Sequence, residues 1–252
     1  MSFADLTNHV ALVTGASGGL GKVIAHELSM AGATVAVHYF RDEDGALETA
    51  RHLKPNANPH HVFQADLSID EVDEVSKALI EQVKFKLSDI TILVNNAADQ
   101  ILSSINEMDS ESWSAMQNST LRSAVSLSRA ASVQMLPGSS IINISSVEAV
   151  APFINHSHYA AAKAGLEVFT KSSAKEFAKG GIRVNAVRPG LIDRENLEID
   201  WPAGLSAWNA RSALARPVGA QEVANAVRFL ASESASGITG EILTVDAGWL
   251  IG

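Results

Sequence analysis

The feature that most constrains this chain is an alternation, from one end to the other, of short apolar runs with longer amphipathic stretches. A helical example is residues 69–83, where Val72, Val75, Leu79 and Val83 share one face. The apolar runs show no alternation of polar and apolar residues, which is typical of strands buried on both faces of a parallel sheet. They lie at residues 10–13, 33–39, 90–94, 140–144, 182–187 and 242–245. Since strands that alternate with helices connect by right-handed crossovers, we predict an α/β fold, a doubly wound parallel sheet of about seven strands with helices on both faces.

The length and the absence of linkers favour one domain. No Pro-, Gly- or Ser-rich linker, charge block or repeat divides the 252 residues, so we predict a single domain over residues 1–252. Residues 191–215 interrupt the alternation of strands and helices, and loops of that length are usually lids or binding segments. This segment carries Trp201 and Trp208, whose amphipathic rings suit contact with an apolar or aromatic substrate. The alternative is that both rings pack the loop onto the core or onto a neighbouring subunit.

Composition and charge argue against several classes of protein. Hydrophobic residues make up 46% of the chain, as in a globular protein, and there is no cysteine for a disulfide or a thiolate metal site. The net charge of −9, without a Lys/Arg-rich stretch, argues against binding to nucleic acid or anionic membranes. No apolar run approaches the roughly 20 residues of a membrane span, and residues 1–5 show no signal-peptide pattern. We therefore expect a cytoplasmic protein with no nucleic-acid partner, no membrane partner and no metal site.

A glycine-rich turn follows the first apolar run. Gly15, Gly19 and Gly21 stand between that run and the next helical stretch, where glycines permit a tight turn and close approach of a pyrophosphate to backbone N–H groups. The alternative is an ordinary turn from a strand to a helix. At the end of the second run there is no acid before Arg41, and a guanidinium suits a 2′-phosphate, which favours NADP(H) over NAD(H). Arg41 could instead be a solvated residue that neighbouring acids at positions 42–44 neutralise.

Three side chains with complementary chemistry follow the run at residues 140–144. Ser146 comes directly after it, at the edge of an open sheet where ligands bind. Tyr159 and Lys163 are four residues apart, so they share one helix face, and an ammonium close to a phenol lowers its pKa. Tyr159 is therefore a candidate general acid or base, and Ser146 could hold a substrate carbonyl.

These residues, in this order and spacing, resemble the short-chain dehydrogenase/reductase family over essentially the whole chain. The nearest subgroup is that of the 3-oxoacyl-carrier-protein reductases. The resemblance implies a Rossmann-type domain and an NAD(P)(H)-dependent oxidoreductase of the ketoreductase type, which interconverts a carbonyl and an alcohol by hydride transfer. The motifs that carry it are Thr14-Gly15…Gly19…Gly21, Asp66-Leu67, Asn95-Asn96-Ala97, Ser146, Tyr159…Lys163, Pro189-Gly190 and the tail at residues 238–248.

The resemblance also implies a role for each matching residue. Tyr159 is the proton donor for reduction, Ser146 and Lys163 complete the catalytic group, and Lys163 also holds the nicotinamide ribose. Substrate contacts are expected from Ser146, Tyr159, Trp201 and Trp208. The residues expected to bind the cofactor are Gly15, Ser17, Gly19, Leu20, Gly21, Tyr39, Arg41, Asp66, Leu67, Asn95, Ala97, Tyr159, Lys163, Pro189, Gly190 and Ile192.

Four positions depart from the family pattern. Ala98 stands in place of a glycine, Gly18 in place of a basic residue of many NADP users, and Arg194 in place of a threonine that contacts the nicotinamide carboxamide. The fourth departure is Thr120, which stands at the catalytic asparagine's position. Asn118 lies about 200° away on a regular helix and cannot simply replace that asparagine. Thr120 can still hold a water by its hydroxyl, so we expect it to take part in the proton relay.

The expected partners are a small-molecule carbonyl or alcohol, apolar, aromatic or an acyl thioester, and further copies of the chain. By resemblance we expect a homotetramer or a homodimer, with apolar surface supplied by Leu121, Val125, Leu166 and Phe169. His156 and His158 could touch the substrate, although polar loop histidines are the simpler interpretation. The alternative function is a cofactor-binding homologue with weak or no catalysis, in a regulatory or structural role.

Overall fold

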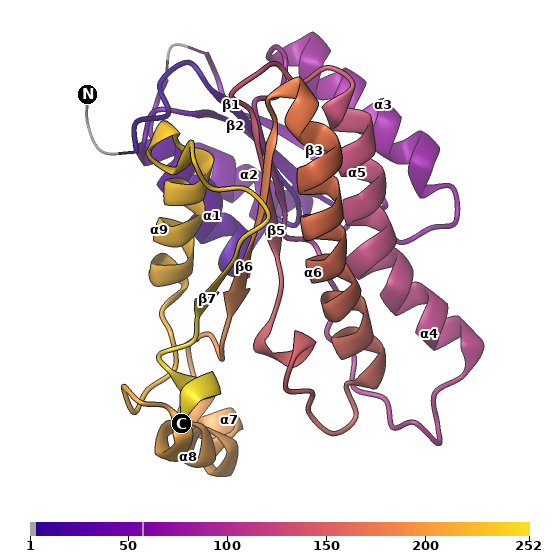
Figure 1. Cartoon of the computed structure of the whole chain (residues 1–252), viewed down its shortest axis with the longest axis vertical. Helices are drawn as coiled ribbons and strands as arrows, with labels where there is room; N and C mark the ends of the chain where they lie inside the picture. Colours follow the sequence, from indigo (N-terminus) through magenta and orange to yellow (C-terminus); the bar gives the residue numbers. More distant parts are fainter. Residues whose placement is uncertain (1–3, 57) are drawn as a thin grey trace.

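The apolar runs form the strands of one parallel sheet, in the order β3-β2-β1-β4-β5-β6-β7 (Figure 1). The computed structural model describes residues 4–56 and 58–252. Residues 1–3, part of the segment that we searched for a signal-peptide pattern, lie outside the described residues. The strands are β1 (Val10–Val13), β2 (Thr34–Tyr39), β3 (His61–Gln64), β4 (Ile92–Asn95), β5 (Ser140–Ile144), β6 (Arg183–Pro189) and β7 (Ile242–Val245). The predicted doubly wound sheet is confirmed, because the strand order reverses at β1, which pairs with both β2 and β4.

Helices cover both faces of the sheet. The helices are α1 (Gly19–Met30), α2 (Glu43–His52), α3 (Val72–Lys86), α4 (Ser110–Gln117), α5 (Ser123–Ser132), α6 (Ser157–Phe177), α7 (Leu197–Asp200), α8 (Pro202–Arg211) and α9 (Ala220–Ala231). A π-helical segment, η1 (Asn118–Arg122), joins α4 to α5. Figure 1 shows α1, α2 and α9 on one face and α3, α5 and α6 on the other. Along β1, Ala11 and Val13 pack on the face covered by α1 and α9. Val10 and Leu12 pack on the opposite face, which α3, α5 and α6 cover.

Three details of the sequence analysis need correction. Strand β3 is absent from the expected runs because only two of its four residues, Val62 and Phe63, are apolar, and only Phe63 is buried. Residues 191–215 are not an irregular loop, since they contain α7 and α8. Leu166 is 1% exposed in the single chain and therefore cannot supply surface for a subunit contact. No helix in the described ranges, 4–56 and 58–252, is both long and apolar enough to span a membrane.

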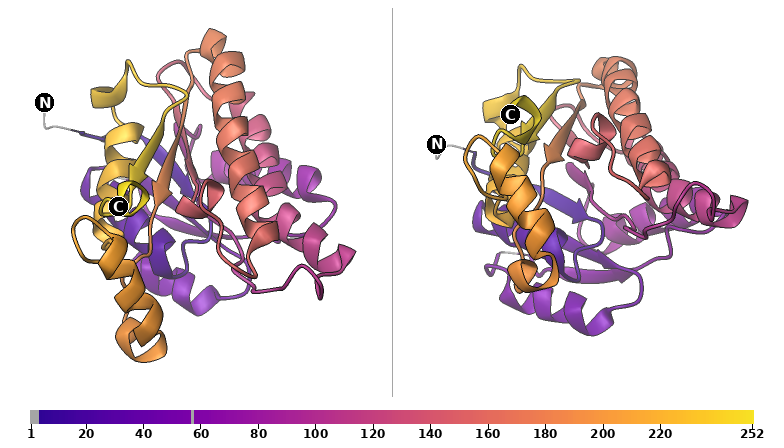
Figure 2. Two further views of the ribbon diagram at one scale, coloured as in Figure 1. Left: turned by 60° about the horizontal axis from the view of Figure 1, so that its bottom comes forward. Right: turned by 90° about the horizontal axis from the view of Figure 1, so that it is seen from below.

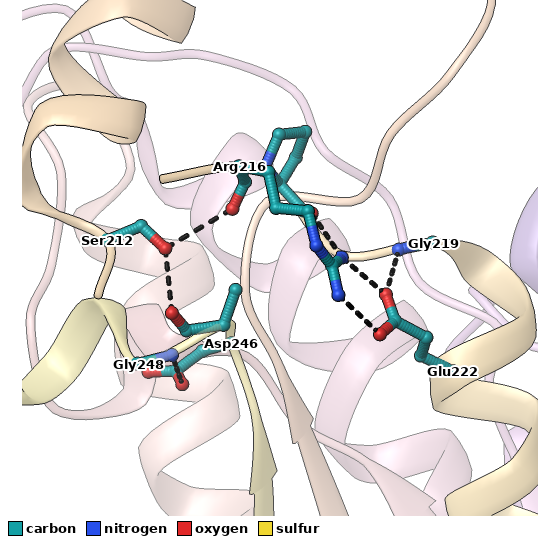
Figure 3. A network of polar contacts seen from close by, with 8 residues as sticks. Ser212, Arg216, Gly219, Glu222, Asp246 and Gly248 are labelled. Atoms are coloured by element: carbon teal, nitrogen blue, oxygen red, sulfur yellow. Dashed lines mark hydrogen bonds and ion pairs between the residues drawn. The ribbon is translucent and has the colours of Figure 1, made fainter. Parts of the chain in front are cut away.

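The segment with α7 and α8 lies beyond the carboxyl ends of the strands, beside the C-terminal turn η5 (Trp249–Ile251) (Figure 2). Its far end is bonded to the turn that follows β7, and the chain just after it is bonded to α9 (Figure 3). The Ser212 hydroxyl lies 2.8 Å from the carbonyl oxygen of Ala247, and Asp246 accepts from the N–H of Gly248 at 2.8 Å. Glu222 of α9 holds Arg216 through two hydrogen bonds of 2.7 and 2.8 Å. We call residues 191–215 the lid.

Candidate active site

A cavity of about 840 Å³ opens between the carboxyl edge of the sheet and the lid. It gathers residues from the glycine turn, from the ends of β5 and β6, from α6 and from the lid. Of the residues predicted from the sequence, those that line it are Gly19, Leu20, Gly21, Ser146, Tyr159, Lys163, Pro189, Gly190, Ile192, Trp201 and Trp208. One cavity therefore brings together the predicted phosphate end, the predicted catalytic group and the lid tryptophans.

The glycine turn is shaped by two positions where a side chain cannot be accommodated. Gly15 has φ +62°, a left-handed conformation that favours glycine. A Cβ at Gly21 would collide with the carbonyl oxygen of Gly15, so glycine is needed there for close packing of helix on turn. The α1 N-cap residue is Gly18, which offers no side chain to the first-turn N–H groups. These N–H groups at a helix N-terminus fit a phosphate, so the turn suits the pyrophosphate of a dinucleotide.

Polar bonds from neighbouring strands hold the turn in place. Thr14 Oγ1 accepts from the N–H groups of Asn96 and Ala97 at 2.9 and 3.0 Å. His38 is 2% exposed, and its Nδ1 accepts from the N–H of Gly15 at 3.1 Å, while Nε2 lies 3.2 Å from the carbonyl oxygen of Ala65. Nδ1 can accept only when it carries no hydrogen, so Nε2 donates to Ala65. Burial lowers the pKa of His38 to about 4, which keeps the ring neutral as this geometry requires.

The catalytic candidates meet on the β5–α6 side of the cavity. Ser146 follows β5, and Tyr159 and Lys163 stand on the first turns of α6, both at most 3% exposed. Lys163 Nζ donates to the carbonyl oxygen of Ile144 at 2.7 Å and lies 5.5 Å from the centre of the Tyr159 ring. The Tyr159 hydroxyl accepts from Gln100 Nε2 at 3.3 Å. The predicted group of Ser146, Tyr159 and Lys163 is thus assembled in one place.

The electrostatics of this group differ from the expectation that Lys163 lowers the pKa of Tyr159. Burial raises the pKa of the Tyr159 phenol, and the charge of Glu148 raises it further, against hydrogen bonds with Gln100 and Ser146. Burial also lowers the pKa of the Lys163 ammonium to about 7. Burial is therefore the largest influence on the pKa of Tyr159, and the phenol keeps its proton at neutral pH.

The residues predicted for the adenosine end do not line the cavity. Arg41 is exposed just beyond β2, with its guanidinium 4.6 Å from the centre of the Phe40 ring. Tyr39 is buried in the core between the sheet and α1, and Leu67 in the core on the opposite face of the sheet. The Asp66 carboxylate accepts from the N–H and hydroxyl of Ser68 at 2.9 and 2.6 Å. Gly15, Ser17, Asn95, Ala97 and Thr120 are likewise outside the cavity wall.

Asn95 is turned into the protein interior. It is 5% exposed, and its amide donates to Asn143 Oδ1 at 2.8 Å. Asn143 in turn donates to the hydroxyl of Thr170 on α6 at 2.8 Å. Asn96, and not Asn95, lines the cavity. The sequence alone did not distinguish the two, because they are neighbours in one motif. Asn95 therefore ties β4 and β5 to α6, the helix that carries the catalytic candidates.

Thr120 lies within η1, so the helix is not regular at this point. Its hydroxyl is buried and lies 3.5 Å from Met116 Sδ. Asn118 reaches the surface, where its amide donates to Asp70 at 3.0 Å. Asn118 therefore does not replace the asparagine that Thr120 displaces.

The two lid tryptophans differ in environment although both line the cavity. Trp208 is 3% exposed and stacks on Trp249, with ring centres 4.6 Å apart and planes 5° from parallel. Trp201 is 45% exposed. Packing onto the core, one of the alternatives that we considered, therefore applies to Trp208, which both packs and lines the cavity, and not to Trp201. Arg194 also lines the cavity, and its guanidinium pairs with Asp200 at 2.5 Å.

Other cavity residues carry chemistry that the sequence analysis did not assign. Gln100 lies three residues after the Asn-Asn-Ala motif, and Glu148 lies two residues after Ser146. Their closeness to these motifs is the signal from which the sequence could have indicated them as cavity residues. His156 also lines the cavity, as the N-cap residue of α6, and its Nδ1 is hydrogen-bonded to Glu148. His158 is 1% exposed within α6 and does not line the cavity.

Comparison with known proteins agrees with this geometry. The family described as Enoyl-(Acyl carrier protein) reductase matches residues 15–250. The chain is 38% identical over 245 residues to 3-oxoacyl-[acyl-carrier-protein] reductase of Escherichia coli strain K12, covering 95% of this chain and 96% of that protein. It is 36% identical over 252 residues to 3beta-hydroxysteroid dehydrogenase 1 of Eggerthella lenta, covering 98% and 95%.

A solved structure with similar coordinates is that of an angucycline C-6 ketoreductase with bound NADP. Its TM-score is 0.89 at 30% identity, and the match covers 98% of each chain. The family resemblance noted from the motifs is confirmed over nearly the full length. The chain belongs to the short-chain dehydrogenase/reductase family of oxidoreductases.

Proposed function

We propose that this chain is an NAD(P)(H)-dependent ketoreductase that interconverts a carbonyl and an alcohol with Tyr159 as the general acid and base. The observation that carries the proposal is the meeting of Ser146, Tyr159 and Lys163 with the glycine turn at one cavity. The relatives support the reaction class, because their names refer to 3-oxoacyl, hydroxysteroid and ketone chemistry. A protein that binds the cofactor without catalysis would not need all three side chains at this place.

The chemistry divides between the cofactor and the protein. A bound nicotinamide supplies the hydride that the carbonyl carbon receives in reduction. The glycine turn and the N-terminus of α1 would hold the pyrophosphate, and Lys163 the nicotinamide ribose. The Ser146 hydroxyl donates to the substrate oxygen and keeps it in line with Tyr159.

Proton transfer is the part that the chain itself performs. The Tyr159 hydroxyl gives its proton to the developing alkoxide, and its raised pKa keeps that proton in place until reduction begins. The Lys163 ammonium, whose pKa is about 7, can give a proton to the phenolate at neutral pH and become the neutral amine. Thr120 is proposed to hold a water in the path that resupplies Lys163.

A preference for NADP(H) over NAD(H) is part of the proposal and rests on Arg41. Asp42, the nearest acid, accepts from the N–H of Gly45 at 2.9 Å as the N-cap of α2. Across residues 4–56 and 58–252, Arg41 forms no ion pair, which leaves its guanidinium free for a 2′-phosphate.

The assay is oxidation of NADPH and of NADH with a panel of ketones, diketones and 3-oxoacyl thioesters. We expect turnover with NADPH, and Arg41→Ala should weaken NADP binding by roughly 1.5–3 kcal/mol, as for a charge-assisted hydrogen bond. NAD affinity should change little. Arg51→Ala, at an exposed arginine of α2, is the matched control and should bind both cofactors as wild type does. Equal losses for both cofactors in Arg41→Ala, or a wild-type preference for NAD, would contradict the proposed selectivity.

A further inference from the structure

A buried pair of a carboxylate and an imidazole, Glu148 and His156, stands in the wall of the cavity beside the catalytic group, and the proposed reaction does not use it. Glu148 lies in the turn η2 (Val147–Ala149), two residues after Ser146, and His156 precedes α6. His156 Nδ1 lies 2.9 Å from both carboxylate oxygens of Glu148. The side chains are 8% and 15% exposed, and both residues line the cavity.

The pair has too few hydrogen-bond donors. An ionised carboxylate only accepts and has about four lone-pair positions. The donors to Glu148 among the described residues are His156 Nδ1 and the N–H of Phe153, the latter at a long 3.4 Å. The other ring nitrogen, Nε2 of His156, is buried, with no partner in the part of the chain that the structure describes. Burying a charge without full pairing is costly, so a ligand that supplies a donor is favoured here.

The position of Glu148 does not serve proton transfer by Tyr159. A carboxylate close to a phenol opposes the phenolate that forms when Tyr159 gives up its proton, and Glu148 does raise the pKa of Tyr159. Holding the turn between β5 and α6 would not require a carboxylate facing the cavity. A contact with the substrate accounts for both the charge and its placement.

The rest of the cavity indicates which donor fits. Phe153 and Trp208 line it with aromatic surface, and their ring centres are 6.4 Å apart. Charged groups of both signs line the cavity, so its wall does not call for a charged substrate. The Glu148 carboxylate already has the His156 ring as a partner and lacks only further hydrogen-bond donors, which a neutral hydroxyl supplies.

We propose that Glu148, held in position by His156, binds a hydroxyl group of the substrate, and that the preferred carbonyl substrate is a hydroxyketone with an apolar or aromatic body. This rests on the proposed ketoreductase function. The hydroxyl lies within a few bonds of the reacting carbonyl, because the N–H of Glu148 donates to the Ser146 hydroxyl at 3.2 Å and the ring centres of His156 and Tyr159 are 5.5 Å apart. The corresponding alcohol product is a diol.

The first test compares turnover of 2-hydroxyacetophenone with that of acetophenone. Hydroxyketones are intrinsically more reactive, so the measured quantity is the ratio of the two kcat/KM values in each variant. Glu148→Gln should lower this ratio about tenfold or more, because the amide weakens a hydrogen bond to a charged group. The ratio for 2-methoxyacetophenone, which lacks the donor, should not change. Glu111→Gln, at an exposed acid in the first turn of α4, should keep the wild-type ratio.

The second test measures binding and needs no catalysis. With NADPH bound, which cannot accept a hydride from an alcohol, calorimetry gives the Kd of 1-phenylethane-1,2-diol and of 1-phenylethanol. We expect wild type to prefer the diol about tenfold or more and Glu148→Gln to lose this preference. His156→Phe should lower it too, because the carboxylate is then no longer held.

The outcomes separate this proposal from the proposed function. If no ketone is turned over but the diol preference depends on Glu148, the catalytic proposal fails and the hydroxyl site stands. If ketones are turned over and the hydroxyketone ratio is the same in wild type and Glu148→Gln, the hydroxyl site is wrong and the ketoreductase stands. A parallel loss for both ketones together with a lower Tm would show that the pair only holds the turn, which also overturns the proposal.

Discussion

The two walls of the cavity are held in place by different kinds of contact. On the wall formed by the sheet edge and α6, buried polar bonds fix the chemistry, such as that from Lys163 Nζ to the carbonyl of Ile144 at 2.7 Å. On the lid wall, position depends on aromatic packing of Trp208 against Trp249 and on exposed ion pairs such as Arg194 with Asp200. Directional bonds inside the fold therefore fix the positions of the candidate catalytic side chains. The shape of the lid wall depends on a few packing contacts, chiefly that of Trp208 with Trp249.

Replacing the two lid tryptophans tests this comparison with the largest expected effect on stability. Trp208→Ala removes a buried, stacked ring and should lower the free energy of unfolding by about 3–5 kcal/mol. Trp201→Ala removes a ring that is 45% exposed and should cost less than about 1 kcal/mol. Urea denaturation of both variants measures the two values. Similar losses would mean that the lid is not anchored at Trp208.

The pH dependence of stability tests the polar wall, and its expected effect is somewhat smaller. His38 has a pKa of about 4 in the folded protein and 6.5 when unfolded, so the unfolded chain takes up the proton first. The stability that neutral His38 provides is complete above pH 6.5 and is lost as the pH falls from 6.5 toward 4. The shift corresponds to a loss of about 3 kcal/mol.

The measurement is the free energy of unfolding across this pH window in wild type and in His38→Asn. The variant should lose most of the slope, while His26→Asn, at an exposed histidine of α1, should retain it. If the slope of His38→Asn equals that of wild type, the neutral ring is not what holds the glycine turn.

Most of the sheet and the catalytic group could be predicted from the sequence because they depend on local patterns. Strands β1, β5 and β7 begin and end where the apolar runs do, since each is made largely of apolar residues whether it lies inside the sheet or, as β7 does, at its edge. Tyr159 and Lys163 share a face simply because they are four residues apart on α6. Ser146 reaches them because the carboxyl ends of parallel strands meet at one edge.

The remaining features depend on contacts between distant residues. Strand β3 has a polar residue at each end, His61 and Gln64, and only two apolar residues between them, so it shows no apolar run. Helix α8 packs through Trp208 onto Trp249, a partner 41 residues later that no local window contains. The pairing of Glu148 with His156 and the burial that raises the pKa of Tyr159 likewise arise only when η2 and α6 come together.

The most direct test of the account is the turnover number of Tyr159→Phe with NADPH and the best ketone found. This change removes the proposed proton donor and keeps the ring, so kcat should fall about 100-fold or more, while the Kd of NADP stays unchanged. The chain's other tyrosine gives the matched control: Tyr39→Phe, in the core at the end of β2, should leave kcat within a few-fold of wild type. Near-wild-type turnover by Tyr159→Phe would show that the phenol is not the acid and would contradict the account.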